Sequence, residues 1–175
     1  MTDKLPDKLE ELISGFDTAM LVTKSLDNGL RARPMAIAGR EDEGVLYFTT
    51  RSEDAKLEEI LHSSAVAVTM QHTDRYLSIS GRARLETDIL LAEKMWTPAM
   101  RAWFPEGYTD SQFTVIRVVP TYAEYWDRTG LRKLELIWET GKAILRGGTA
   151  NDQGLSGHEK VPLGKDETKA PDDRN

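Results

Sequence analysis

The 175-residue chain has no cysteine, only three histidines and no apolar run long enough to span a bilayer. Without cysteine there can be no disulfide, no thiol catalysis and no thiolate metal site. The histidines, His62, His72 and His158, lack the spacing of a metal-binding helix, so we predict no metal site. The first residues also lack the apolar core of a signal peptide, which makes the cytoplasm the expected location.

The charge balance excludes further classes of protein. Lys and Arg number 23 against 29 Asp and Glu, which gives a formal net charge of −6. An acidic surface argues against general binding to nucleic acid or to anionic membranes, although it allows a local basic pocket. The length suits one domain, which we place at residues 1–148. Residues 149–175 are mostly polar and are predicted to form a partly disordered tail.

Most of the chain is typical of short strands joined in hairpin order. Asp27-Asn28-Gly29 is a turn signal, because Asn and Gly accept positive φ. Pro34 lies inside a strand and marks an edge or a bulge, since proline cannot donate to a ladder. We therefore predict a mainly β fold, a small six-stranded antiparallel barrel with flanking helices. The predicted strands are 18–23, 30–38, 45–50, 65–71, 75–85 and 113–126, and the main predicted helices are 5–16, 53–61, 88–96 and 134–145.

The segment from Leu30 to Lys56 carries the chemistry that the sequence suggests. Arg31 and Arg33 alternate with apolar residues in one predicted strand, so both side chains project from the same face. Two cations in line on a half-buried face are costly unless an anion meets them. Ser52 opens the predicted helix that follows, whose amino end offers free N–H groups, with Lys56 about one turn further on. These groups together predict a phosphate site.

A purely structural interpretation of the same residues remains open. Arg31 and Arg33 could pair with nearby acids such as Glu41 or Asp42 on a solvated face. Glu53 and Asp54 in the first turn of the helix could already balance its dipole.

Four separated motifs in the chain resemble one known family. They are Arg31-Ala-Arg-Pro-Met, Tyr47-Phe-Thr-Thr with Ser52 and Lys56, the Trp96-to-Gly107 loop, and Arg117-Val-Val-Pro-Thr-Tyr-Ala-Glu-Tyr-Trp-Asp. In this order they resemble the FMN-binding split barrels related to pyridoxamine 5′-phosphate oxidase, and within them the general stress protein 26 group. The resemblance implies a six-stranded antiparallel split β-barrel that forms a homodimer, with FMN at the subunit interface.

The resemblance also implies roles for individual residues. Arg33 and Lys56 would hold the FMN phosphate, with Ser52 assisting. Pro34 and Met35 would line the flavin ring through main chain, Phe48, Thr49 and Thr50 would contact ring and ribityl chain, and Gln71 would lie beside the site. Trp126 and Trp103 would approach the flavin from the partner subunit. No residue is predicted to be a general acid or base.

One departure separates the chain from the vitamin B6 oxidases. In those enzymes the strand that ends in tryptophan is followed by an Arg-Leu-His-Asp-Arg segment, which grips the substrate phosphate. Here Trp126 is followed by Asp-Arg-Thr-Gly-Leu-Arg-Lys-Leu-Glu, without histidine. The leading hypothesis is thus an FMN-binding stress protein with oxidoreductase chemistry on an unassigned substrate. The alternatives are a pyridoxamine or pyridoxine 5′-phosphate oxidase, and a non-catalytic barrel that serves as a binding module.

Overall fold

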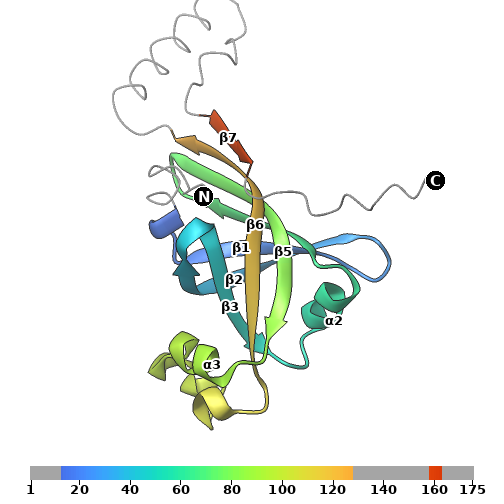
Figure 1. Ribbon diagram of the computed structural model, residues 1–175, viewed down its shortest axis with the longest axis vertical. Coiled ribbons are helices and arrows are strands. Elements are labelled where there is room, and N and C mark those ends of the chain that lie inside the picture. Colours follow the sequence, from blue (N-terminus) through green and yellow to red (C-terminus); the bar gives the residue numbers. More distant parts are fainter. Residues whose placement is uncertain (1–12, 128–157, 163–175) are drawn as a thin grey trace, which may run out of the picture.

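The computed structural model describes residues 13–127 and 158–162, and its centre is a closed antiparallel β-barrel (Figure 1). The chain enters through β1 (Thr18–Lys24), β2 (Leu30–Glu41) and β3 (Val45–Arg51), with a short 3-10 turn, η1 (Asp42–Gly44), before β3. It continues through β4 (Ala65–Gln71), β5 (Arg75–Glu86) and β6 (Phe113–Asp127). The strand order is β3-β2-β1-β4-β5-β6, and pairing of β3 with β6 closes the ring. The predicted six-stranded antiparallel barrel is confirmed.

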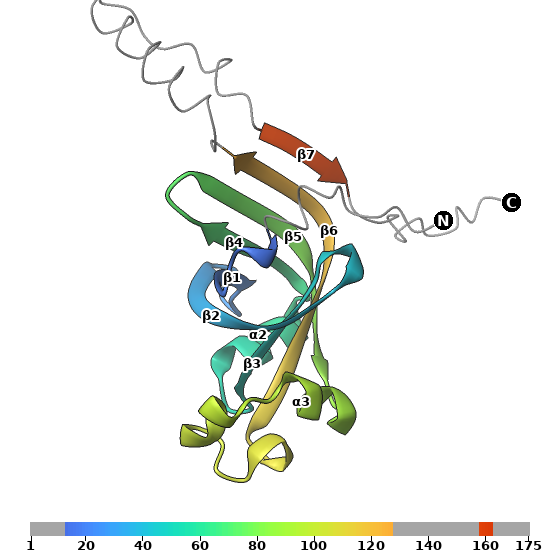
Figure 2. The same ribbon diagram turned by 90° about the vertical axis from the view of Figure 1, so that its left-hand side faces the viewer.

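A seventh strand, β7 (His158–Pro162), pairs with the upper part of β6, from Tyr122 to Trp126. β5 pairs along one edge of β6, whereas β3 and β7 share the other edge, because β3 pairs only with the segment Phe113–Val118 (Figure 2). Thus the tail that the sequence predicts from Thr149 contributes a strand to the sheet, which its polar composition does not indicate. The predicted helix at 134–145 and most of the predicted helix at 5–16 lie outside the described residues.

The barrel interior is filled by inward-facing strand residues, which alternate with outward-facing ones in β1, β4 and β5 as period-2 patterning requires. β3 is buried on both faces, because Val45 and Tyr47 belong to a second apolar cluster with Met95 of α3. The side chains that are most completely buried are Phe48, Leu21, Leu46, Leu77, Ile79, Ile116, Val68, Val115 and Val118. The turn before β2 has Asn28 at φ 64°, as its Asp-Asn-Gly sequence predicts. Pro34 pairs with Met20 of β1, whereas β3 begins to pair with β2 only at Ile37, so Pro34 lies on a locally open edge.

Within the described ranges, helices α2 and α3 flank the barrel. Helix α2 (Ala55–His62) follows β3 and packs its buried face against the barrel. The sequence predicted that Ser52 opens this helix, but it begins later, with Asp54 as N-cap. Helix α3 (Ile89–Met95) is capped by Asp88, which accepts a hydrogen bond from Leu90 N at 2.9 Å. The aromatic segment after α3 forms two short 3-10 turns, η2 (Pro98–Ala102) and η3 (Gly107–Thr109).

Two glycines mark places where a side chain would meet a neighbour. At Gly81, where the register between β5 and β6 shifts, an added Cβ would lie 2.5 Å from the carbonyl oxygen of Val119. At Gly39 an added Cβ would lie 2.4 Å from Met95 Sδ. The first obstacle is backbone and the second is the end of a flexible side chain, which can rotate away.

We therefore expect Gly81→Ala to lower the free energy of unfolding by about 1–3 kcal/mol, because strands β5 and β6 must separate to make room. Gly39→Ala is the matched control and should cost clearly less. Urea unfolding of both variants measures the difference, and equal losses would contradict the explanation.

Candidate functional site

The two arginines of β2 meet a buried carboxylate on α2. Arg33 Nη1 lies 2.8 Å from Glu59 Oε2 and Arg33 Nη2 lies 2.9 Å from Glu59 Oε1, a bidentate pair. Thr23 Oγ1 donates to Glu59 Oε2 at 2.6 Å, and Arg31 Nη1 lies 3.4 Å from Glu59 Oε1. Glu59 is only 2% exposed, so it can remain charged because these donors replace its water.

The pairing fixes the ionisation of Glu59. The Arg33 guanidinium, helped by the Thr23 hydroxyl, lowers the pKa of the Glu59 carboxyl although burial opposes the shift. Because the folded-state pKa is depressed, the pair stabilises the fold above the pKa of the unfolded carboxyl. That stability is lost as the pH falls through the folded-state pKa.

The third cation, Lys56, lies one turn before Glu59 on the buried face of α2. Its Nζ lies 2.6 Å from Asp54 Oδ2 and 2.8 Å from Thr50 Oγ1. Thr50 Oγ1 also donates to Asp54 Oδ2, and the main-chain N of Arg51 lies 3.3 Å from the same oxygen. Burial opposes ionisation of Asp54, but the hydrogen bonds from Lys56 and Thr50 prevail and lower its pKa. An ammonium, a hydroxyl and a backbone N–H thus converge on one anionic oxygen.

The structural interpretation of the arginines was partly right but named the wrong acids. Arg31 and Arg33 do pair with a carboxylate, but the partner is Glu59. Glu41 instead accepts a hydrogen bond from Tyr47 Oη at 2.8 Å and lies 3.6 Å from Lys94 Nζ. Sequence reasoning missed Glu59, because its role depends on how α2 packs on the barrel and brings Glu59 to the arginines of β2. The only local signal is its position three residues after Lys56, on the same helix face.

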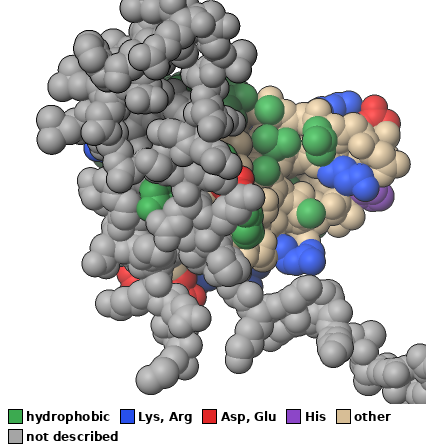
Figure 3. Space-filling model, turned by 90° about the horizontal axis from the view of Figure 1, so that it is seen from above, with side chains coloured by type: hydrophobic (Ala, Val, Ile, Leu, Met, Phe, Trp, Pro, Cys, Tyr) green, Lys and Arg blue, Asp and Glu red, His purple; other side chains and the backbone are tan. Residues whose placement is uncertain are grey.

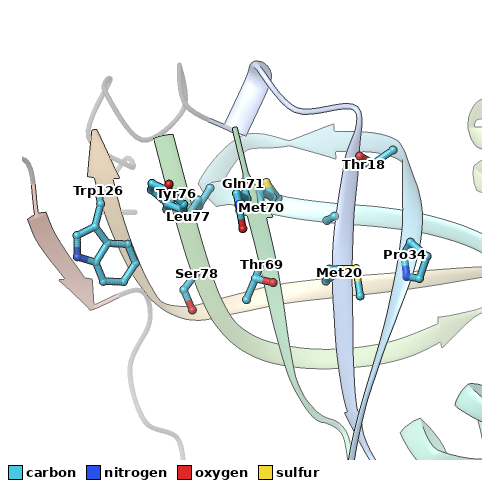
Figure 4. A pocket seen from close by; sticks show the side chains of 11 residues that line it. Thr18, Met20, Pro34, Thr69, Met70, Gln71, Tyr76, Leu77, Ser78 and Trp126 are labelled. Carbon is cyan, nitrogen blue, oxygen red and sulfur yellow. The ribbon is translucent and has the colours of Figure 1, made fainter. Parts of the chain in front are cut away.

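A separate pocket of about 350 Å³ lies on the outer face of the sheet. Figure 4 shows its side chains on five neighbouring strands, with Pro34 of β2 at one end and Trp126 of β6 at the other. From β2 to β6 the strands span about 19 Å at the usual spacing of about 4.8 Å. Its described lining carries no formal charge and consists of Thr18, Ala19, Met20, Pro34, Thr69, Met70, Gln71, Tyr76, Leu77, Ser78 and Trp126. Such a lining suits an uncharged, partly apolar group with hydrogen-bonding edges.

The structure places the other predicted site residues in different surroundings. The side chains of Met35 and Phe48 are buried in the core and are not accessible from the surface. Thr49 Oγ1 lies 3.9 Å from Met100 Sδ. Ser52 Oγ lies 2.9 Å from Gln112 Oε1, and Trp103 is 63% exposed on the segment after α3.

The predicted residues therefore fall mainly into two groups on opposite faces of β2. Arg33 contacts Glu59 of α2, the helix that also carries Lys56, whereas Pro34 lines the outer pocket with Gln71 and Trp126. Adjacent strand residues point to opposite sides, so this division follows from the register itself. A single chain does not bring the cationic group and the outer pocket to one face.

Comparison with known proteins identifies the family. The model of the family described as "Pyridoxamine 5′-phosphate oxidase like" matches residues 4–151. The chain belongs to the pyridoxamine 5′-phosphate oxidase-like family. The family that the sequence motifs predicted is thereby confirmed, and none of the helices among the described residues is long and apolar enough to cross a membrane.

Over the aligned stretches, this oxidase-like chain is only about a quarter identical to individual relatives and solved structures. It is 28% identical over 135 residues to Protein bli-3 of Neurospora crassa, covering 70% of this chain and 65% of the relative. It is 25% identical over 80 residues to General stress protein 26 of Bacillus subtilis, covering 43% and 56%. Both alignments span less than two thirds of the relative. The solved structure of the general stress FMN/FAD binding protein from Xanthomonas citri is 26% identical, with a TM-score of 0.61, and covers 70% of this chain and 88% of that protein.

Proposed function

We propose that this protein binds FMN between the subunits of a homodimer and serves as a flavin-dependent general stress protein, with redox chemistry on an unassigned substrate. The observation that carries the proposal is the convergence of Lys56 Nζ, Thr50 Oγ1 and the Arg51 backbone N–H on one anionic oxygen. Arg33 adds a guanidinium on the same side of β2. Ammonium, hydroxyl, guanidinium and main-chain N–H groups are the donors that a phosphate selects.

The outer pocket suits the flavin ring. Its uncharged lining offers Trp126 and Pro34 as flat or apolar surfaces and Gln71 as a hydrogen-bonding side chain. The volume of about 350 Å³ lies within the range of small-ligand pockets. The flavin, when bound, supplies the redox chemistry, and the protein's own residues hold the phosphate, orient the ring and exclude water.

A homodimer would allow one flavin to contact both the phosphate donors and the outer pocket. Since Arg33 and the Gln71–Trp126 pocket lie on opposite faces of β2, one flavin reaches both kinds of contact most simply when the pocket residues come from a partner subunit. The outer face also suits close approach, because its exposed or half-buried residues are mostly small and uncharged: Thr18, Val22, Ala32, Pro34, Ala36, Ala67, Thr69, Ser78 and Ser80. Viewed from above, the visible described surface shows hydrophobic side chains among neutral ones, with separate Lys and Arg side chains between them (Figure 3).

The general stress assignment is favoured over oxidation of pyridoxamine phosphate. The relatives with stated roles include General stress protein 26 and a general stress FMN/FAD binding protein. A phosphorylated vitamin would also need a second set of cations near the ring, and the described pocket lining has none.

The test is flavin binding itself. The purified protein should be yellow, or should quench the fluorescence of added FMN, and mass spectrometry of the heat-released ligand should identify FMN rather than FAD. Arg33→Ala or Lys56→Ala should each weaken FMN binding by about 1.5–3 kcal/mol, the typical value of a hydrogen bond to a charged group.

Matched controls remove the same charges elsewhere. Arg84→Ala and Lys94→Ala each remove one cation from an exposed ion pair, with Glu86 and Glu41 respectively, and should leave FMN affinity unchanged. If Arg33→Ala and Lys56→Ala bind FMN as tightly as these controls, the phosphate site is misplaced.

A further inference from the structure

The two acids that α2 and its N-cap present to the cations differ in burial. The side chain of Asp54 is 41% exposed, whereas that of Glu59 is 3% exposed. Asp54 can exchange its contacts for water at little cost, but removing Arg33 from Glu59 would leave a buried carboxylate without its main partner. The two ion pairs are therefore unequal, although both join a basic side chain to an acid of the same short segment.

Asp54 also has other hydrogen-bond donors within its reach, which it does not use. It is the N-cap residue of α2, yet its side chain makes no capping hydrogen bond. Its carboxylate instead occupies the point where Lys56, Thr50 and the Arg51 N–H converge. An aspartate displaced from that point could accept from the first-turn N–H groups of α2, as N-cap aspartates usually do.

Resting on the flavin function proposed above, we infer that Asp54 is a stand-in anion that the FMN phosphate displaces, whereas Glu59 is a positioning residue that holds Arg33 in place while the phosphate binds. Asp54 and Glu59 thus act in opposite directions on the affinity for FMN. Asp54 competes with the ligand for Lys56 and Thr50. Glu59 keeps two N–H groups of the guanidinium occupied and so fixes the direction of the remaining ones.

Two variants of equal charge change test the inference. Asp54→Asn and Glu59→Gln each remove one negative charge from α2 or its cap. We expect Asp54→Asn to bind FMN severalfold more tightly, because the neutral amide competes poorly for Lys56. Glu59→Gln should bind FMN about tenfold more weakly, because Arg33 loses a bidentate, charge-assisted partner. Fluorescence titration of flavin-free protein gives both dissociation constants.

Further measurements separate these roles from a merely structural one. Riboflavin lacks the phosphate, so neither variant should change its affinity. Thr23→Val removes the hydroxyl that contacts both Glu59 and Arg33, and should weaken FMN in the same direction as Glu59→Gln without altering a buried charge. In an Arg33→Ala background, Glu59→Gln should have no further effect on FMN.

The direction in which each variant changes FMN affinity tests the inference. Tighter binding in both variants would mean that the acids act only as bulk negative charge, and weaker or unchanged binding of Asp54→Asn would show that Asp54 is not a competitor. Either outcome overturns the inference while leaving the flavin function intact. If the wild-type protein has no affinity for FMN, the proposed function fails and the inference falls with it.

Discussion

Phe48→Ala should lower the free energy of unfolding by about 3–5 kcal/mol, the usual cost of removing a phenyl ring from a closed core. Phe48 has no exposed surface and lies on β3 at the centre of the main core cluster. Its neighbours belong to strands fixed by pairing on both sides, with Ile37 of β2 and Ile116 of β6 opposite. The cavity therefore cannot collapse easily. Denaturant unfolding followed by circular dichroism measures the loss.

Leu61→Ala is the control for stability. It removes apolar atoms from a side chain that is 74% exposed, and it should change the free energy of unfolding by no more than about 0.5 kcal/mol.

The Phe48→Ala variant also separates folding from binding at this position. Because the Phe48 ring is enclosed, contact between this residue and a flavin is limited to main chain. Folded Phe48→Ala protein should therefore retain its FMN affinity, and a selective loss of affinity without loss of stability would contradict this placement.

Ala67→Arg should convert the proposed homodimer into a monomer. Ala67 lies on β4 in the middle of the outer face, paired with Val22 of β1 and Ser80 of β5. An arginine there would be buried without a partner on dimerisation, at a cost of about 3–5 kcal/mol, so association should weaken by more than about a hundredfold. Sedimentation velocity measures the change, and FMN affinity should fall with it because the pocket residues of the partner are lost.

Leu90→Arg provides the matched control. Leu90 is 71% exposed on α3, away from the outer-face residues, and its replacement should leave the dimer intact. A wild-type protein that sediments as a monomer would refute the proposed assembly, and so would an Ala67→Arg variant that remains dimeric.

Much of the fold could be predicted because the information is local. Short apolar or alternating runs predicted all six barrel strands, the Asp-Asn-Gly sequence predicted the turn before β2, and Pro34 indicated an edge or a bulge. The late start of α2 could not be predicted so easily. Ser52, Glu53 and Asp54 are all acceptable near a helix N-terminus, and the long-range bond of Ser52 to Gln112 decides against Ser52.

The candidate site was predictable in its cations but not in their partners. Arg33 and Lys56 stand out by residue type and spacing, whereas Glu59 and Asp54 gain their roles from three-dimensional contacts with β2 and β3. Strand alternation predicted that Arg31 and Arg33 share one face, and the same rule places Pro34 on the other. That the phosphate donors and the outer pocket lie on different faces became clear only from the complete sheet.

The closure of the barrel also affects how the chain emerges during synthesis. β3 is made early, but its outer edge finds its partner only when the segment Phe113–Val118 of β6 has been translated. Until then the nascent sheet has an unpaired edge next to the hydrophobic strand Val45–Arg51, which is the kind of surface that chaperones bind and that aggregates. Native closure must therefore wait for β6, and ribosome-bound chains that stop short of β6 should be the most vulnerable to misassembly.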